Sequence, residues 1–289
     1  MLGEWDVVVV GGGPVGLYGT RGGVMPPLVR GVVDDLLQRL DALGGLNVPQ
    51  DGLQGRIRVR SYDVAAYKCA ADQFLQAAGA EVLFHAYAAG VVVQTVSQAQ
   101  TLEAVLVETK SGRRALRAAQ FIDASGDADI AHFAGVPYKL GDGAGDALYP
   151  STMFRVGGVD ATRALAAIGE FKAIDTLMAQ AADRYDFPRI GAILRPQRDT
   201  SQRRANVTQL RKAQGRAVDA TDALQLSAAE TAGRRQAVEC MRLLRAEVPG
   251  FEWAEVAEIG VVEGWGGFGR LISLTAKPER PVTFRTQIL

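Results

Sequence analysis

Four consecutive valines followed directly by a glycine-rich turn constrain the fold of this chain more than any other feature. Asp6–Val10 is apolar without alternation, which is typical of a central strand buried on both faces of a parallel sheet. The next residues include Gly11, Gly12, Gly13, Pro14 and Gly16. Glycines at positions 11, 13 and 16 allow a tight turn and bring backbone N–H groups close to a pyrophosphate. The pattern therefore predicts a dinucleotide-phosphate site, the alternative being a glycine turn that binds nothing.

Two further parts of this dinucleotide fingerprint are missing. Residues 17–27 contain three glycines and two prolines, so a crossover helix of normal length does not fit there. A second strand should end in an acidic residue for the ribose hydroxyls roughly 20 residues after the turn. The candidates, Asp34 and Asp35, lie within a helical pattern instead. Solvated helix surface is the favoured interpretation of both carboxylates.

Helical and extended patterns alternate through the first half of the chain. Apolar spacing predicts amphipathic helices over 30–43 and 63–78, and a strand over 81–86. Three short β-favouring segments, 90–96, 103–109 and 114–118, predict an antiparallel meander. A strand over 120–124 and a short helix over 128–134, capped by Gly135, complete this half.

The second half is richer in alanine and arginine, and we place a domain boundary near Pro150. Helix is predicted over 160–184, followed by an irregular region over 187–204. Ser227 and Glu230 form a capping-box pattern that predicts the start of a helix ending at Val248. No periodicity is assigned to the remaining residues.

Composition argues against several classes of partner. The 32 basic and 32 acidic residues of the 289 cancel, so no net charge attracts nucleic acid or an anionic membrane. No stretch has the length and apolarity of a membrane span, and no basic leader precedes the valines, so we expect a cytoplasmic protein. His85 and His132 have no metal-ligand spacing around them, and Cys69 and Cys240 are far apart, so neither metal nor disulfide is expected.

A second motif, Phe121–Asp127, is a strand that ends in the turn Asp-Ala-Ser-Gly-Asp. With Ala134–Pro137, Met153–Asp160, Gly233–Gln236 and Val248–Glu252, it resembles FAD-dependent oxidoreductases of the glutathione-reductase-type fold. The resemblance covers 6–16 and most of 29–260. Relatives carry a helix, a strand and a glycine-rich loop that are absent after the first motif here, and they continue beyond residue 289. The resemblance therefore implies a chain shortened internally and at its C-terminus.

This resemblance implies an α/β fold: a Rossmann-like FAD-binding parallel sheet with an antiparallel β-meander and a helical substrate-side region. The FAD-binding domain would be 1–150, with the meander at 90–118, and the substrate or cap region 151–289. The implied cofactor-binding residues are Gly11, Gly12, Gly13, Pro14, Gly16, Val82, Gly126 and Asp127. The strand containing Val82 would pair beside the first strand, near the adenine.

The implied function is FAD-dependent oxidation or reduction of a small molecule, with no catalytic side chain assigned. A non-catalytic remnant unable to hold FAD and a nicotinamide-linked dehydrogenase remain the alternatives. The meander before Asp123 favours FAD over NAD, because a simple dinucleotide-binding domain lacks it. Four arginines could contact an anionic substrate, the alternative being that they are solvated surface residues. They are Arg203, Arg204, Arg234 and Arg235. Neither the substrate nor the oligomeric state follows from the sequence.

Overall fold

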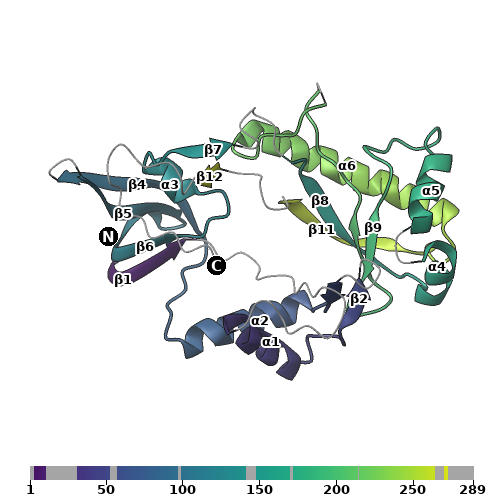
Figure 1. Ribbon diagram of the computed structural model, residues 1–289, viewed down its shortest axis with the longest axis horizontal. Coiled ribbons are helices and arrows are strands. Elements are labelled where there is room, and N and C mark those ends of the chain that lie inside the picture. Colours follow the sequence, from purple (N-terminus) through teal and green to yellow (C-terminus); the bar gives the residue numbers. More distant parts are fainter. Residues whose placement is uncertain are drawn as a thin grey trace.

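Two antiparallel-rich sheets, each with its own helices, dominate the described part of the chain (Figure 1). This computed structural model describes residues 3–10, 31–52, 57–96, 99–140, 148–169, 172–213, 215–263 and 270–272. The strands are β1 (Gly3–Val10), β2 (Gln50–Gly52), β3 (Ile57–Val59), β4 (Ala86–Val96), β5 (Ala99–Thr109), β6 (Gly112–Asp123), β7 (Tyr138–Leu140), β8 (Ser151–Gly157), β9 (Ile193–Pro196), β10 (Arg203–Asn206), β11 (Glu255–Glu263) and β12 (Arg270–Ile272). The helices are α1 (Val32–Ala42), α2 (Val64–Ala77), α3 (Asp129–Phe133), α4 (Ala161–Ile168), α5 (Lys172–Gln180) and α6 (Ala223–Glu247).

The first sheet has the strand order β1-β6-β5-β4 and combines a parallel pair with a meander. β1 runs parallel to β6, whereas β6, β5 and β4 pair antiparallel in sequence order. The α/β class and the antiparallel meander are therefore confirmed. The two strands predicted over 114–118 and 120–124 are one strand, β6, which links the meander to the parallel pair.

The predicted strand over 81–86, with Val82 beside the first strand, is wrong. Residues 81–85 form an irregular connection, and β4 begins only at Ala86. His85 has a φ of 55°, a left-handed conformation that interrupts an extended chain. β4 pairs antiparallel with β5 at the sheet edge opposite β1, so it does not extend the parallel pair.

The valine strand does not lie at the centre of the described sheet, contrary to the sequence prediction. β1 is an edge strand there, with β6 as its neighbour. Val8 is 9% exposed, whereas Val7 and Val9 are 47% and 57% exposed. Successive side chains of a strand point to opposite faces, so one face of β1 is covered and the other is open among the described residues.

Helices α1 and α2 form a separate pair that lies close to the predicted bounds. The Asp63 carboxylate accepts a hydrogen bond from Ala66 N at 2.8 Å and so caps α2. Leu36 and Leu40 of α1 pack with Ala70 of α2 in a small apolar cluster. The Ser61 hydroxyl donates to the carbonyl of Pro196 at 3.0 Å, so the segment before α2 contacts β9.

The second sheet has the order β11-β8-β10-β9 and is antiparallel throughout. The single helix predicted over 160–184 is wrong: α4 ends at Ile168, its C-cap Gly169 has a φ of 57° that favours glycine, and α5 is separate. The region predicted as irregular contains β9 and the start of β10. The residues without assigned periodicity contain β11 and β12.

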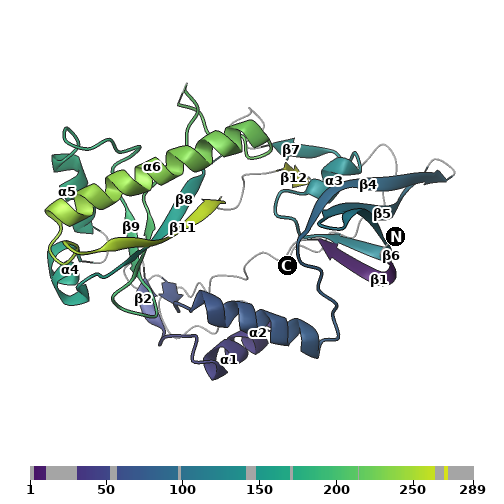
Figure 2. The ribbon, with the colours of Figure 1, turned by 180° about the vertical axis from the view of Figure 1, so that it is seen from behind.

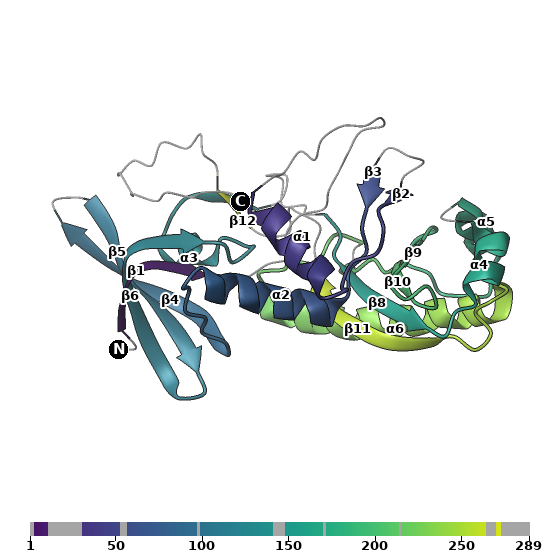
Figure 3. The same cartoon turned by 90° about the horizontal axis from the view of Figure 1, so that it is seen from below.

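Helices α4, α5 and α6 cover one face of this sheet. Phe154 and Val156 of β8 point toward them, in a core that includes Met178 of α5 and Leu244 of α6. The long helix α6 runs beside β8 and β11 when the molecule is seen from behind and from below (Figures 2 and 3). The opposite face carries the residues of odd number on β8, which include Met153 and Arg155.

The capping box predicted at Ser227 is wrong, because α6 begins one turn earlier. Asp222 is the N-cap residue, and its carboxylate accepts from Leu224 N at 2.9 Å and from Gln225 N at 3.1 Å. Ser227 is therefore inside the helix. Hydrogen bonds from the backbone and side chain of Gln225 hold the pKa of Asp222 below its ordinary value.

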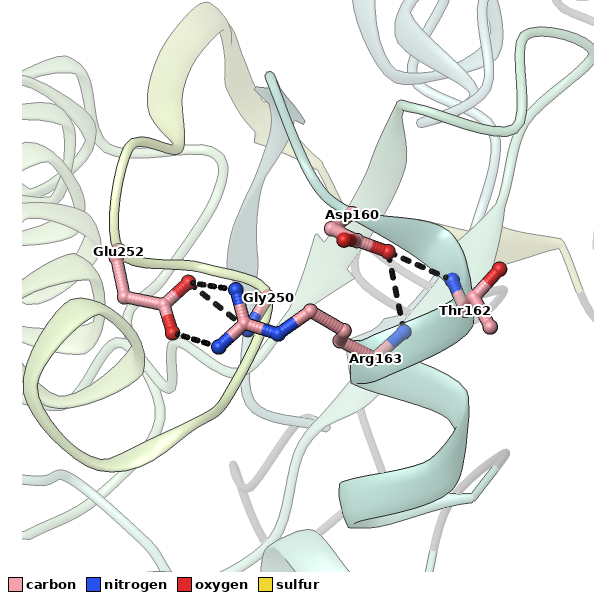
Figure 4. A network of polar contacts seen from close by, with 5 residues as sticks. All are labelled: Asp160, Thr162, Arg163, Gly250 and Glu252. Carbon is pink, nitrogen blue, oxygen red and sulfur yellow. Dashed lines mark hydrogen bonds and ion pairs between the residues drawn. The ribbon is translucent and has the colours of Figure 1, made fainter.

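The end of α6 is joined to the start of α4 by a polar network (Figure 4). Arg163 donates to both carboxylate oxygens of Glu252, at 2.6 and 3.2 Å, and Asp160 caps α4. Gly250 has a φ of 93°, and a Cβ there would lie 2.7 Å from the Asp160 carbonyl oxygen. The predicted stop at Pro249 and Gly250 thus also permits a close contact between two helix ends.

Replacing Gly233 with alanine should destabilise the protein. A Cβ at Gly233 would lie 2.1 Å from Oγ1 of Thr152, where α6 crosses β8. Overpacking of this kind costs about 1–3 kcal/mol, whereas an unhindered glycine-to-alanine change in a helix stabilises by about 1 kcal/mol. Urea denaturation should therefore give a lower free energy of unfolding for Gly233→Ala, but not for Thr231→Ala on the exposed side. An increase for Gly233→Ala would contradict the close approach.

Replacing Asp222 with alanine should lower the thermal midpoint at pH 7, and Ser227→Ala should leave it almost unchanged. Asp222 has a lowered pKa in the folded state, so its contribution is complete above the ordinary pKa of about 3.9 and is lost as pH falls through the folded value. Thermal melts of both variants at pH 7 and at a pH well below the ordinary pKa of Asp222 measure this. Equal effects of the two substitutions would place the helix start at Ser227 after all.

Candidate FAD site

The carboxyl ends of β1 and β6 lie side by side at one edge of the first sheet. Val10 is the register partner of Asp123, and Ala124 N donates to the carbonyl of Val10 at 2.7 Å. The two sequence motifs therefore begin at neighbouring points, because Gly11 follows Val10 and Ala124 follows Asp123. Gly11, Gly12, Gly13, Pro14 and Gly16 themselves lie outside the described residues. Ligands of open α/β sheets bind beyond the carboxyl ends of parallel strands.

The carboxylate of Asp123 organises the turn after β6. One oxygen accepts from the Ser125 hydroxyl at 2.6 Å and from Ser125 N at 3.1 Å, and the other accepts from Ala131 N at 2.9 Å. The Ser125 hydroxyl oxygen also accepts from Asp129 N at 2.9 Å. Two free N–H groups of the first turn of α3 are thereby satisfied by side chains of the preceding strand and turn.

The turn between β6 and α3 requires unusual backbone conformations. Gly126 has a φ of 94°, and Ala128, which precedes α3, has a φ of 55°. Gly126 is exposed, and a Cβ built there meets no heavy atom within 4 Å among the described residues. Glycine is needed at this position for its backbone conformation, and the backbone remains accessible to a ligand. Asp127 is partly buried beside it.

The described residues fit FAD at this edge but supply no ribose carboxylate there. Two adjacent strand ends and an accessible turn at Gly126 suit a pyrophosphate. Asp34 and Asp35 lie on α1, as the sequence pattern indicated, and the Asp34 carboxylate accepts from Gly31 N at 3.2 Å. Val82 is 41% exposed in the connection before β4. Its contact with a cofactor stays a prediction, as does that of Gly126 and Asp127.

Other reactive side chains do not assemble into a site within the described part of the chain. No group of three or more potential metal ligands occurs there, and the two cysteines are free. Burial raises the pKa of the Cys240 thiol to about 12, which removes its nucleophilic form at neutral pH. His132 contacts the rings of Phe133 and Tyr138, so it has a packing role.

The four arginines considered as anion ligands do not converge. Arg203 is buried on the helix-covered side of β10 and donates to the carbonyls of Thr200 and Gln202. Arg204, the next residue of the strand, points to the other face. Arg234 and Arg235 lie on α6, where Arg234 pairs with Glu230 at 3.2 Å.

None of the described helices combines the length and hydropathy required to cross a bilayer.

A sequence profile of the family described as FAD dependent oxidoreductase matches residues 19–265. The chain belongs to this family. The match includes β6 and the Asp123–Asp127 turn but begins after the glycine turn at 11–16. The finer assignment to the glutathione-reductase type stays a prediction. No curated protein matches the chain.

Among solved structures, the family member is similar to p-nitrophenol 4-monooxygenase PnpA from Pseudomonas putida DLL-E4, at 11% identity and a TM-score of 0.40, over 73% of this chain and 44% of that one. It is similar to BexE at 12% identity and a TM-score of 0.44, over 84% and 47%. It is also similar to a geranylgeranyl bacteriochlorophyll reductase-like protein from Thermoplasma acidophilum, at 14% and 0.42, over 72% and 44%. The chain thus spans less than half of each of these proteins, and similarity this low supports no conclusion about its activity.

Replacing Asp123 with asparagine should loosen the turn and α3. The amide nitrogen of asparagine cannot accept the hydrogen bond from Ala131 N, and loss of such a bond to a carboxylate costs about 1–3 kcal/mol. Hydrogen exchange at Asp129 N and Ala131 N should accelerate, while Asp72→Asn on the exposed side of α2 should leave both unchanged. Unchanged exchange in Asp123→Asn would show that the carboxylate does not hold the turn.

Proposed function

We propose that this chain carries out FAD-dependent oxidation or reduction of a small molecule. The observation that carries the proposal is the shared edge of β1 and β6, where Val10 and Asp123 bring both sequence motifs together. Membership of the FAD-dependent oxidoreductase family supports it.

The residues at this edge would bind and orient the cofactor. Backbone N–H groups at Gly11, Gly13 and Gly16 would approach the pyrophosphate, with the turn at Gly126 and Asp127 beside it. Bound FAD supplies a flavin ring that accepts or donates hydride. Asp123 and Ser125 would hold the second turn in place through the hydrogen bonds to Asp129 N and Ala131 N. Residues 1–150 would form this FAD-binding domain and residues 151–289 the substrate region.

A non-catalytic remnant is the second candidate, favoured by the exposed side of β1. Val7 and Val9 are about half exposed, although the strand has the composition of one buried on both faces. Among the described residues, the two candidates for the ribose carboxylate, Asp34 and Asp35, lie on α1. A nicotinamide-linked dehydrogenase is less consistent with the meander that precedes Asp123. A cytoplasmic location and a small-molecule substrate without nucleic-acid or membrane partners remain predictions of the sequence.

The visible spectrum of the purified protein, with and without added FAD, tests this function. We expect weak retention of flavin, because ring, ribose and pyrophosphate contacts each contribute only a few kcal/mol and the ribose carboxylate is missing. Gly13→Val should abolish retention by placing a side chain where the pyrophosphate approaches the backbone. Gly90→Val is the matched control, because a Cβ there lies at an ordinary 3.7 Å from Leu106 on β5.

The outcomes separate the two candidates. Stoichiometric yellow flavin that survives gel filtration would show that the site is intact and would overturn the expectation of weak binding. A colourless protein that also fails to bind added FAD would favour the remnant. Loss of flavin in both glycine variants would indicate general unfolding, which circular dichroism of the same samples detects.

A further inference from the structure

Three arginines stand in one row across the second sheet, on the face away from α4, α5 and α6. Arg204 of β10 is the register partner of Arg155 on β8 and of Arg195 on β9. Directly opposite residues of antiparallel strands share a face, with Cβ atoms about 4.5–5.5 Å apart. Figure 3 shows β9, β10 and β8 as neighbours. The register therefore places three arginine side chains on one face, with their Cβ atoms in neighbouring positions.

The central arginine of this row lacks a countercharge among the described residues, whereas Arg155 has one. Glu258 of β11 faces Arg155, and its carboxylate contacts Nη2 of Arg155 at 2.8 Å. Arg204, at the centre, has no hydrogen-bond or ion-pair partner among the described residues. The other described positions on this face of β8, β9 and β10, such as Met153, Ile193 and Asn206, are uncharged. Like charges directly opposite one another destabilise a sheet.

The row is shielded enough for its charge to act strongly on a ligand. The Arg155 side chain is 35% exposed, and Arg195 and Arg204 are also partly buried. Attraction between charges is stronger near such a surface than in bulk water. The guanidinium fork also matches carboxylate and phosphate oxygens, which it can hold through two parallel hydrogen bonds. The geometry therefore suits an oxyanion that bridges neighbouring arginines.

We propose that Arg204, with Arg155 and Arg195, binds an oxyanion group, carboxylate or phosphate, of an anionic substrate. The identification of the ligand as a substrate rests on the proposed FAD-dependent function, whereas anion binding by the row does not. The groove on α6 is the rival site. It is lined by Arg234 and Arg235, but Glu239 and Asp186 line it too, and Arg234 already pairs with Glu230.

The experiment is calorimetric titration of the full chain, without FAD, with citrate and separately with inorganic phosphate. Arg204→Gln should weaken binding of the better probe by about tenfold or more, since a hydrogen bond to a charged group is lost. Arg204→Lys should retain part of the affinity, because it keeps the charge without the fork. Arg235→Gln on α6 should bind as the original protein does.

Thermal melts of the same variants provide a readout that a structural role would not give. Removing the central cation relieves like-charge repulsion, so Arg204→Gln should melt at the same or a higher temperature while binding less anion. A lower melting temperature with unchanged affinity would assign Arg204 to the fold and overturn the proposal. Absence of binding to either probe, or loss in Arg235→Gln instead, would overturn it as well.

Flavin titration keeps this proposal separate from the function on which the substrate rests. If anions bind to the row and FAD does not bind, the anion site stands and FAD-dependent oxidoreduction fails. If FAD binds and Arg204→Gln leaves anion affinity unchanged, FAD-dependent oxidoreduction stands and the anion site fails. Tighter binding of citrate than phosphate would identify the substrate group as a carboxylate, and the opposite order as a phosphate.

Discussion

The parallel pairing of β1 with β6 is the interaction on which the candidate site depends. Its register sets Val10 opposite Asp123, and the bond from Ala124 N to the Val10 carbonyl ties the two strand ends together. Residues more than 110 positions apart in sequence thus share one edge. The meander makes this possible, because β6 serves both as its last strand and as the partner of β1. Weakening this pair would separate the glycine turn from the second turn.

At this edge, the residues that stabilise the turn after β6 differ from the residue that leaves its backbone accessible. Asp123 and Ser125 use their side chains to satisfy the start of α3, so the second turn is fixed without a ligand. Gly126 leaves its backbone accessible in the same turn. On β1 the opposite holds: Val7 and Val9 remain exposed, and no described strand pairs beyond them. The second turn is therefore preformed, whereas the first strand is covered on one face only among the described residues.

Local sequence patterns predict those helices and strands whose formation depends on neighbouring residues. They fail where contacts between residues distant in sequence determine the structure. The meander, α1 and α2 follow from periodicity and turn residues. The strand predicted through His85 is wrong, because the left-handed conformation of His85 has no signal in the sequence. Asp222 and Ser227 both precede helical spacing, and only the observed cap distinguishes them. Both sequence motifs of the site could be recognised, but their adjacency depends on the strand order of the folded sheet. The acidic residue expected to bind the ribose hydroxyls has no equivalent at the expected strand end.

The arginine row shows that local sequence patterns also fail to predict which charged residues share a face of a sheet. The sequence pattern groups Arg204 with its neighbour Arg203 as candidate anion ligands, but Arg203 lies on the other face and donates to carbonyls. Arg155 and Arg195 came into view only through register, because they are 49 and 9 positions away from Arg204. A sheet that keeps like charges opposite one another gives up stability, and a bound anion is the simplest source of compensation. Antiparallel register therefore sets the charge of this face, as parallel register sets the position of the two turns.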